Sequence, residues 1–259
     1  MSQRDQLEGR NVVFEALKRG KRRVIRVLID DHARAGGKVD DILALAAAAK
    51  VPVIPTPRHE LDRRSETGVH NGVIAEAHPL EVPTVAQLLD DLARRGEYPF
   101  LALVDEVQYE HNLGAIMRSA LGAGVHAVIV PVRRGKGLTP VVQRVAMGAA
   151  EEVPLIREGL LSAVATLRRA GVRLIGADMD GAPCWETRMD GPLAIVLGGE
   201  DKGLSPPLRD RCDAIVAVPL AGGLESLNVS VTAGVLLFEK VRQDRVAASA
   251  SRRAATALS

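Results

Sequence analysis

Glycines and small polar residues that could hold a ligand gather in three short segments of the chain. The last segment joins a predicted strand, Ala214–Val218, to a long apolar helix, and Gly222 and Gly223 allow the backbone between them to turn sharply. Ser226 and Asn228 stand at the predicted start of that helix, where they can cap it or position a hydroxyl or a carboxylate. A loop that leaves the carboxyl end of a strand and enters a helix is a favoured ligand site in α/β proteins. This segment therefore predicts a ligand site or, more simply, a capped strand–turn–helix.

The second segment is IVLGGEDKGLS, residues 195–205, in which a buried strand runs into Gly198, Gly199 and Glu200. It has neither the Lys-Ser/Thr ending of a P-loop nor the GxGxxG spacing of a dinucleotide loop. The two glycines can let backbone amides meet a small ligand. Glu200 can hold a polar group or an arginine of a partner.

The third segment is VDEVQYEHNLGAIMRSALGAG, residues 104–124, which contains Asn112 and Arg118. Asn112 stands where a helix cap is expected, and Arg118 lies within the helix. A face of small residues on this helix lets another helix or a ribose-phosphate chain approach closely: Ala115, Ser119 and Gly122. Arg118 could also simply form a salt bridge with a nearby acid, Glu106 or Glu110.

The elements that must position these segments alternate regularly from Phe100 onward. Strands of nearly continuous Val, Ile, Leu and Ala alternate with helices, which predicts a parallel sheet covered on both faces. A dinucleotide-binding fold has its glycine loop after the first strand, whereas here the glycine loops come late. The order therefore disfavours a dehydrogenase.

Residues 1–78 predict a smaller α/β unit, with a helix over Leu7–Arg19 and strands over Val24–Ile29 and Val69–Ala77. It carries a basic run of Lys18, Arg19, Lys21, Arg22, Arg23 and Arg26. This run is either a solvated helix end or a surface that faces phosphates. Residues 79–98 predict a linker with one helix, and residues 99–245 predict the larger domain. Residues 246–259 have no core pattern and predict a disordered tail.

Composition limits the remaining alternatives. The 259 residues are 47% hydrophobic and only 2% aromatic, so we expect an aliphatic core. The net charge of +2 is too small to indicate a nucleic-acid partner by itself. Cys184 and Cys212 are far apart and the histidines have no metal-type spacing, so we expect a reducing, cytoplasmic setting and no metal. We expect no membrane span and no signal peptide.

The motifs NLGAIMRSA, LGGEDKGL and VPLAGGLESLNVSV, in this order, resemble the three motifs of the SpoU (TrmH) branch of the SPOUT RNA methyltransferases. The resemblance covers residues 100–242. The preceding unit, with GRNVVFEAL and GVHNGVIAEA, resembles the L30e-like substrate-binding domain of that branch. This pairing is most similar to the bacterial enzymes that methylate a guanosine of 23S rRNA, whereas tRNA enzymes of the branch usually lack the N-terminal domain.

The resemblance implies an α/β domain with a deep trefoil knot and S-adenosylmethionine (SAM) bound in it. The positions that match the cofactor-binding motifs are Gly198, Gly199, Val218, Leu220 and Leu227. It also implies a homodimer in which each active site draws on both subunits.

By the same resemblance, Arg118 acts on the target ribose 2′-OH, and four other residues complete the catalytic set: Asn112, Glu200, Ser226 and Asn228. Because a guanidinium stays charged, we expect Arg118 to stabilise the developing alkoxide or to bind phosphate. The expected function is methyl transfer from SAM to a ribose 2′-OH of RNA, with a guanosine of 23S rRNA as the substrate. The alternatives are a tRNA-directed enzyme and a non-catalytic RNA-binding module.

Overall fold

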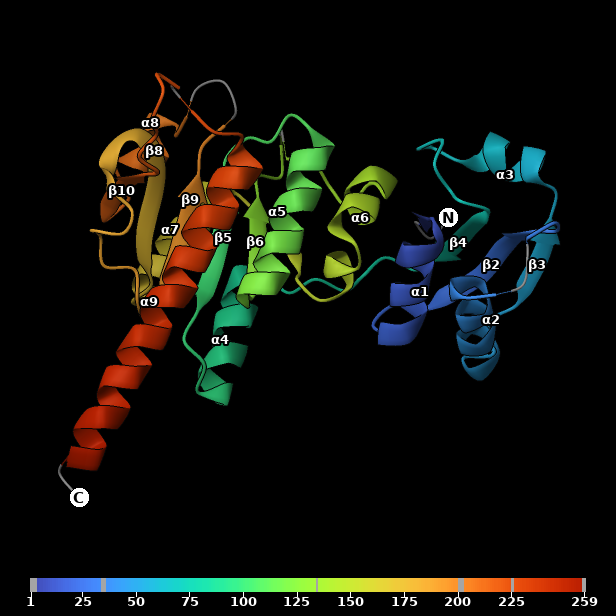
Figure 1. The fold of residues 1–259 in the computed structure, drawn as a ribbon, viewed down its shortest axis with the longest axis horizontal. Helices are drawn as coiled ribbons and strands as arrows, with labels where there is room; N and C mark the ends of the chain where they lie inside the picture. The colour runs from blue at the N-terminus through green and yellow to red at the C-terminus, as the bar shows by residue number, and fades with distance from the viewer. Residues whose placement is uncertain (1–3, 34–35, 134, 200–202, 225, 258–259) are drawn as a thin grey trace. The chain divides into compact units, whose positions relative to one another are not determined.

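The computed structural model describes residues 4–33, 36–133, 135–199, 203–224 and 226–257 (Figure 1). The chain divides into two compact units. Unit 1 comprises Met1–Val82 together with Leu138–Glu152, and unit 2 comprises Pro83–Gly137 together with Val153–Ser259.

Unit 1 is built on a four-stranded sheet in the order β1-β4-β2-β3, in which only the β2–β3 pair is parallel. Its strands are β1 (Asp5–Glu8), β2 (Val24–Asp30), β3 (Val53–Thr56) and β4 (Val73–Ala77). Its helices are α1 (Arg10–Arg19), α2 (Lys38–Ala48), α3 (Arg58–Arg64) and α6 (Pro140–Ala146), followed by the 3₁₀ turn η1 (Ala149–Glu151).

The first element of unit 1 differs from the predicted helix over Leu7–Arg19. Gly9 has φ +97° and separates β1 from α1, and Leu7 is a fully buried strand residue opposite Ala75 of β4. A left-handed backbone at Gly9 breaks the helix there, which the apolar spacing did not reveal.

Glu8 is fully buried at the end of β1 and organises the loop that follows α3. Its carboxylate accepts hydrogen bonds from the hydroxyls of Ser65 and Thr67 and from the backbone N–H of Glu66, the last at 2.7 Å. Burial raises the pKa of Glu8, but the hydrogen bonds from Thr67, Ser65 and Glu66 outweigh this effect and leave the pKa below its ordinary value.

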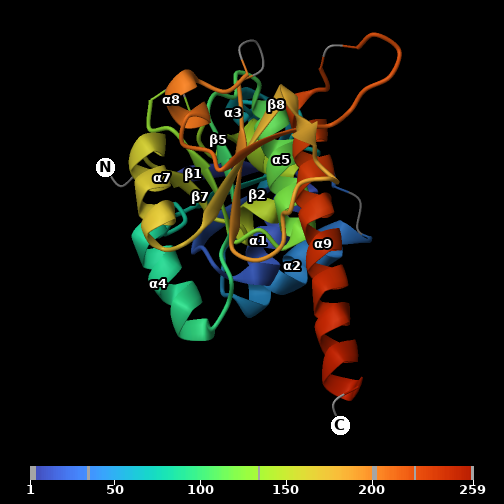
Figure 2. The ribbon, with the colours of Figure 1, turned by 90° about the vertical axis from the view of Figure 1, so that its left-hand side faces the viewer.

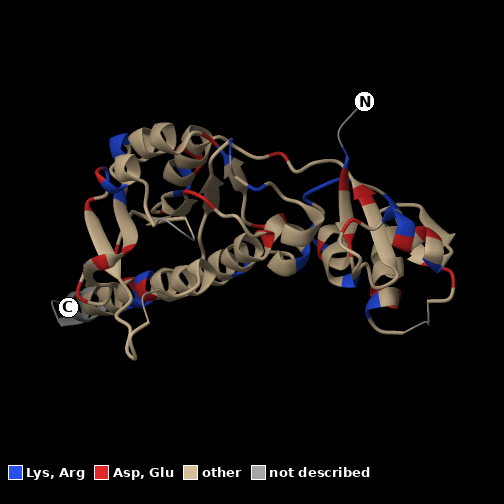
Figure 3. Ribbon diagram, turned by 90° about the horizontal axis from the view of Figure 1, so that it is seen from above, with Lys and Arg blue, Asp and Glu red and all other residues tan. Residues whose placement is uncertain are grey.

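The basic run of unit 1 is largely neutralised inside the unit. Arg22 is buried and forms ion pairs with Asp5 at 3.0 Å and Glu151 at 2.8 Å, while Lys21 contacts Glu152 at 2.6 Å. Acidic and basic residues are interspersed along this unit (Figure 3). Within the described residues, Arg23 is the member of the run that is exposed and has no partner. The interpretation as a phosphate-facing surface is therefore not favoured.

Unit 2 contains a six-stranded, fully parallel sheet in the order β10-β8-β9-β5-β6-β7, as the aliphatic runs predicted. Its strands are β5 (Phe100–Val104), β6 (Ala127–Val130), β7 (Leu155–Arg157), β8 (Arg173–Pro183), β9 (Leu193–Leu197) and β10 (Ala214–Ala217). Its helices are α4 (Val85–Arg95), α5 (Glu110–Ala123), α7 (Leu160–Arg169), α8 (Pro206–Arg209) and α9 (Val229–Ala257). Figure 2 shows α4 and α7 on one side of the sheet and α5 and α9 on the other.

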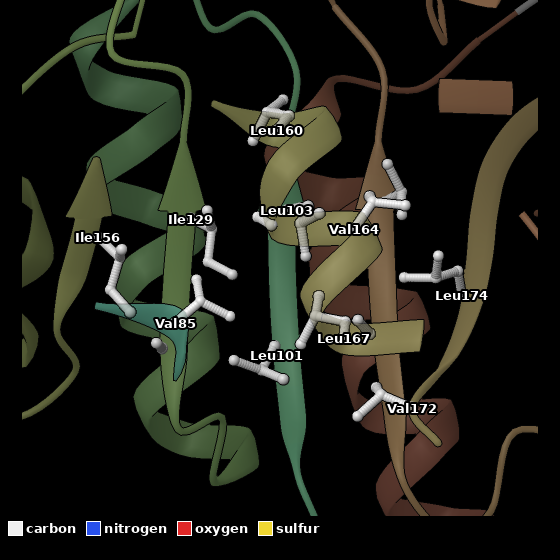
Figure 4. Close-up of a cluster of buried hydrophobic side chains, with 14 of the residues drawn as sticks. Val85, Leu101, Leu103, Ile129, Ile156, Leu160, Val164, Leu167, Val172 and Leu174 are labelled. Atoms are coloured by element: carbon white, nitrogen blue, oxygen red, sulfur yellow. The ribbon is translucent and has the colours of Figure 1, made fainter. Parts of the chain in front are cut away.

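The core of unit 2 is aliphatic, and Figure 4 shows the part between the sheet and the helices α4 and α7. Leu101 and Leu103 of β5 point into this layer, where they meet Val164 and Leu167 of α7. Because successive strand residues point to opposite faces, Ala102 faces the α5–α9 layer. Thr84 caps α4: its hydroxyl accepts a hydrogen bond from the N–H of Gln87, whose side-chain oxygen accepts one from the N–H of Thr84, which completes a capping box.

The small-residue face of α5 packs against α9. A Cβ added to Gly122 would lie 3.4 Å from the ring of Phe238, and one added to Gly234 would lie 3.7 Å from Ser119 Oγ. The sequence left open whether another helix or a ribose-phosphate chain approaches this face, and in the structure the neighbour is the helix α9.

The tail expected over residues 246–259 is corrected, because α9 continues as a helix to Ala257. The Ala-rich composition of this stretch gives it high helix propensity even without a core-facing pattern. Among the described residues, no helix is long and apolar enough to cross a membrane.

Candidate functional site

A pocket of about 900 Å³ lies in unit 2 at the carboxyl ends of the parallel strands, where α/β sheets bind ligands. Three strands form its floor and walls: β9 and β10 end at it, and β8 passes it at Ala177–Met179. The starts of α5 and α9 close it. The residues that line it are Tyr109, Asn112, Ala177, Asp178, Met179, Leu197, Gly198, Gly199, Gly203, Val216, Ala217, Val218, Pro219, Leu220, Leu224, Ser226, Leu227, Asn228, Val229 and Thr232.

The glycine loop after β9 makes one wall of the pocket out of backbone. Gly199 and Gly203 pair through two backbone hydrogen bonds, of 2.9 and 3.2 Å. A Cβ on Gly198 would lie 2.2 Å from the carbonyl carbon of Gly203, so only glycine fits there. The segment can therefore present main-chain groups to a ligand without side chains in the way.

Asn112 and Asn228 meet across the pocket. Asn228 Nδ2 donates to Asn112 Oδ1 at 3.1 Å, while Asn228 Oδ1 accepts from the N–H of Ser230 at 2.9 Å and so caps α9. Asn112 does not cap α5 as predicted, because Tyr109 occupies the cap position. Its place in the first turn of α5 instead directs its side chain toward the start of α9.

The loop before α9 supplies the opposite wall. Val218, Leu220, Ser226 and Leu227 line the pocket. Gly222 has φ +72° and Gly223 has φ +73°, so the sharp turn that the sequence predicted at these two glycines is present.

Asp178 and Arg209 are site residues that the sequence analysis missed. Asp178 lines the pocket in the middle of β8, one residue beyond the part of β8 that pairs with β9. Arg209 Nη1 donates to Asp178 Oδ2 at 2.7 Å, and Arg209 Nη2 donates to Asp180 at 2.7 Å. Asp178 also lies beside Gly203, where an added Cβ would be 3.3 Å from its Oδ2. The rule that ligands bind at strand carboxyl ends could have indicated Asp178, since the sequence supports a strand over Val172–Ala177 that ends directly before it.

Of the predicted catalytic residues that the structure describes, Arg118 is not part of this lining. Glu200 lies outside the described residues. Arg118 is exposed on α5, and within the described part of the chain it makes no hydrogen bond or ion pair, so the alternative of a salt bridge with Glu106 or Glu110 is not observed.

No group of three or more His, Cys, Asp or Glu residues that could hold a metal ion occurs among the described residues. The pocket instead combines backbone groups, two carboxamides, one carboxylate and apolar side chains. This donor set suits an organic ligand with both polar and apolar parts.

Comparison with known proteins identifies the family. Residues 99–238 match the model of the SpoU rRNA Methylase family, and residues 6–83 match the model described as RNA 2′-O ribose methyltransferase substrate binding. The chain belongs to the SpoU rRNA methylase family, as its three motifs predicted.

Relatives of full length sharpen the comparison. The 23S rRNA (guanosine-2′-O-)-methyltransferase RlmB of Pseudomonas putida is 40% identical over 249 residues, which are 95% of this chain and 99% of the relative. The putative TrmH family tRNA/rRNA methyltransferase YacO of Bacillus subtilis is 33% identical, covering 93% of this chain and 96% of the relative. The crystal structure of the SpoU methyltransferase AviRb from Streptomyces viridochromogenes, in complex with AdoMet, has a TM-score of 0.75 at 25% identity and covers 92% of this chain and 89% of that one.

Proposed function

We propose that this protein transfers a methyl group from SAM to a ribose 2′-OH of RNA, with a guanosine of 23S rRNA as the substrate. The observation that carries the proposal is the single pocket into which segments from all three motifs converge, at Asn112, Gly198 and Asn228. The 23S rRNA substrate is supported by the relative of Pseudomonas putida, which is 40% identical over nearly the whole of both chains.

The pocket fits the donor. Its volume of about 900 Å³ is in the range of organic cofactor sites. The bare backbone at Gly198 and Gly199 offers main-chain hydrogen-bonding groups, and Val218, Leu220 and Leu227 offer an apolar surface. When bound, SAM supplies an electrophilic methyl group on a sulfonium.

The chain's own residues would then orient and activate the acceptor. Asn112 and Asn228 hold each other and present amide groups beside the loop of Ser226, so they can fix the position of a ribose hydroxyl. Arg118 would stabilise the negative charge that develops as the 2′-OH loses its proton. Glu200 is proposed to orient one of these groups, as in the family motif, and no metal is proposed to take part.

Because Arg118 is exposed and away from the pocket lining, we propose that it acts in the pocket of a second subunit. The homodimer would cover the large apolar side chains that α5 and α9 leave exposed: Leu121, Val231, Val235, Phe238 and Val246. Their exposure, 37% to 57%, is unfavourable in an isolated chain.

Mixed dimers test this arrangement. Arg118→Ala and Asn228→Ala each inactivate a homodimer, but a mixed dimer keeps one pocket with intact Asn228 and an intact arginine from the other subunit. Equal mixing should restore about a quarter of wild-type activity, because half of the dimers are mixed and each has one intact site. Mixtures that stay inactive would show that Arg118 acts in the pocket of its own subunit, and would contradict the arrangement proposed here.

The direct test of the proposed function is ribose-methylation mapping of rRNA and tRNA from cells with and without the gene. One guanosine of 23S rRNA should lose its 2′-O-methyl group in the deletion strain and regain it with the wild-type gene but not with Asn112→Ala. A tRNA position that responds instead would support the tRNA-directed alternative. An unchanged map, with no heat on titration of the purified protein with SAM, would support a non-catalytic RNA-binding module.

Two further expectations belong to this proposal. The trefoil knot of unit 2 is implied by the family. A cytoplasmic location is supported by the free thiols of Cys184 and Cys212 and by the ribosomal substrate.

A further inference from the structure

We propose that Tyr109 is a stacking surface for the nucleobase of the RNA nucleotide that is methylated. This inference rests on the proposed function and adds to it the residue that holds the base of the acceptor. The aromatic ring lines the pocket, yet 64% of the residue is exposed.

The fold does not require a tyrosine at this position. Tyr109 occupies the N-cap of α5, where Ser, Thr, Asp or Asn is favoured because a short side chain can accept a backbone hydrogen bond. The Tyr109 side chain makes no such bond, and its hydroxyl has no hydrogen-bond partner within the described residues. The ring therefore contributes little to the helix or to the core.

Its backbone ties the ring to the polar centre of the site. The carbonyl of Tyr109 accepts a hydrogen bond from the N–H of Asn112 at 3.0 Å, and Asn112 in turn accepts from Asn228 at 3.1 Å. The ring is thus anchored one helical turn from the pair that we propose to position the ribose. A ribose held by this pair would therefore bring its base to the side of the pocket where Tyr109 lies.

The rim of the pocket shares this apolar character. Met179 and Leu224 also line the pocket, and they are 67% and 64% exposed. Three large apolar side chains from three separate segments are therefore open to solvent around one pocket, which marks a surface that a ligand covers. An unstacked base has an apolar face for an aromatic ring and polar edges for the amides beyond it.

The occupant we assign to the ring is the acceptor base and not the donor. We assign SAM to the backbone at Gly198 and Gly199, which follows β9, and to the wall of Val218 and Leu227, which lies between β10 and α9. Tyr109 belongs to the α5 side of the pocket, with Asn112.

The test compares Tyr109→Ala, Tyr109→Phe and Tyr109→Trp with wild type. Tyr98→Ala is the matched control, because Tyr98 is a 74% exposed tyrosine of the same unit that does not line the pocket. The probe is a 23S rRNA transcript that carries the guanosine methylated by the wild-type protein. RNA affinity is measured by fluorescence anisotropy, SAM affinity by calorimetry, and kcat and KM by methyl transfer.

Tyr109→Ala should weaken RNA binding and raise KM for RNA by roughly 5- to 150-fold, the range for loss of one base–aromatic stack. The Phe and Trp variants should stay within about threefold of wild type, since stacking needs a ring and no hydroxyl. SAM affinity and the Tyr98→Ala control should be unchanged. A fluorescent guanine analogue at the target position should be quenched by wild type and not by Tyr109→Ala.

Four results would overturn the inference. They are wild-type RNA affinity in Tyr109→Ala, weakened SAM binding in that variant, failure of Tyr109→Phe to rescue, and dissociation of a dimer, which would place the ring in a subunit interface. If the wild-type protein binds the transcript but methylates no RNA, the proposed function is wrong. The RNA affinities of the Tyr109 variants would still show whether the ring stacks on a base.

Discussion

Among glycine-to-alanine substitutions at Gly198, Gly199 and Gly203, Gly198→Ala should lower stability and SAM affinity the most. The new Cβ would lie 2.2 Å from the carbonyl carbon of Gly203 and 2.5 Å from the N–H nitrogen of Leu204. Both are backbone atoms, so no side-chain rotation can relieve the overlap. The loop must open, and the two hydrogen bonds between Gly199 and Gly203 are lost.

The magnitude follows from these contacts. Overpacking of this kind costs about 1–3 kcal/mol, and each lost backbone hydrogen bond about 0.5–1.5 kcal/mol. The free energy of unfolding of unit 2 should therefore fall by about 2–6 kcal/mol, which is roughly 5–20 °C in Tm. Affinity for SAM should fall at least tenfold, since this backbone forms one wall of the pocket.

Two matched variants grade the effect. A Cβ on Gly199 would meet Glu106, with its Cβ at 3.3 Å and its backbone oxygen at 3.5 Å, and one on Gly159 would meet nothing within 4 Å. Both substitutions should therefore cost less than Gly198→Ala. Trp185 is the only tryptophan of the chain and belongs to unit 2, so its fluorescence reports the unfolding of that unit. If Gly198→Ala unfolds and binds SAM like Gly159→Ala, the argument from backbone contact is wrong.

Three other changes have expected outcomes. The pKa of Glu8 is lower in the folded than in the unfolded protein, so its contribution to stability is present above about pH 4.3 and is lost as the pH falls through the folded pKa. Glu8→Gln should therefore lower Tm near neutral pH, and the Tm values of the variant and the wild type should converge near pH 3. Circular dichroism at several pH values measures both. Burial raises the pKa of Cys212 to about 11, so this thiol should react with Ellman's reagent at pH 8 only slowly until the protein is denatured, and rapid reaction in the native state would contradict the burial. Arg209→Ala should weaken SAM binding, because it releases Asp178 from its ion pair in the pocket. Since this ion pair is partly exposed, the free energy of unfolding should fall by no more than about 1 kcal/mol. An unchanged affinity for SAM in calorimetry would contradict a role of Asp178 in binding SAM.

The parallel sheet could be predicted from the sequence because burial on both faces leaves a local trace. Strands such as Leu193–Leu197 are aliphatic at every position, and all five of these residues are buried. The order of strands in the sheet has no such trace, since β5 pairs with β9 across about ninety residues of sequence. That pairing is what carries Asn112, after β5, to the pocket after β9.

The misplaced boundaries have a common cause. Gly9 breaks an apolar periodicity that continues on both sides of it, and the Ala-rich end of α9 is helical without any core pattern. In both places backbone preference decides the structure, while hydrophobic spacing is misleading or absent. The predicted cap of α5 was also wrong. Asn112 is of a residue type that often caps helices, but in the structure its side chain contacts Asn228 instead.

Asp178 and Tyr109 show the limit of motif-based reasoning about the site. Neither is a glycine or part of one of the three motifs. Asp178 reaches the pocket from the middle of β8, and Tyr109 reaches it from the start of α5. Their roles depend on what surrounds them: Asp178 has a paired arginine, and the ring of Tyr109 has solvent.

The position of Arg118 explains why one chain does not complete the proposed site. Residues Asn112 and Arg118 are six apart on α5, and at about 100° per residue they point in directions roughly 120° apart around the helix axis. A straight helix that places Asn112 in its own pocket therefore turns Arg118 away from it. In the proposed homodimer, the arginine would meet the acceptor from the second subunit. The exposed apolar side chains of Leu121 on the same helix and Phe238 on α9 give a second copy a surface on which to bring it there.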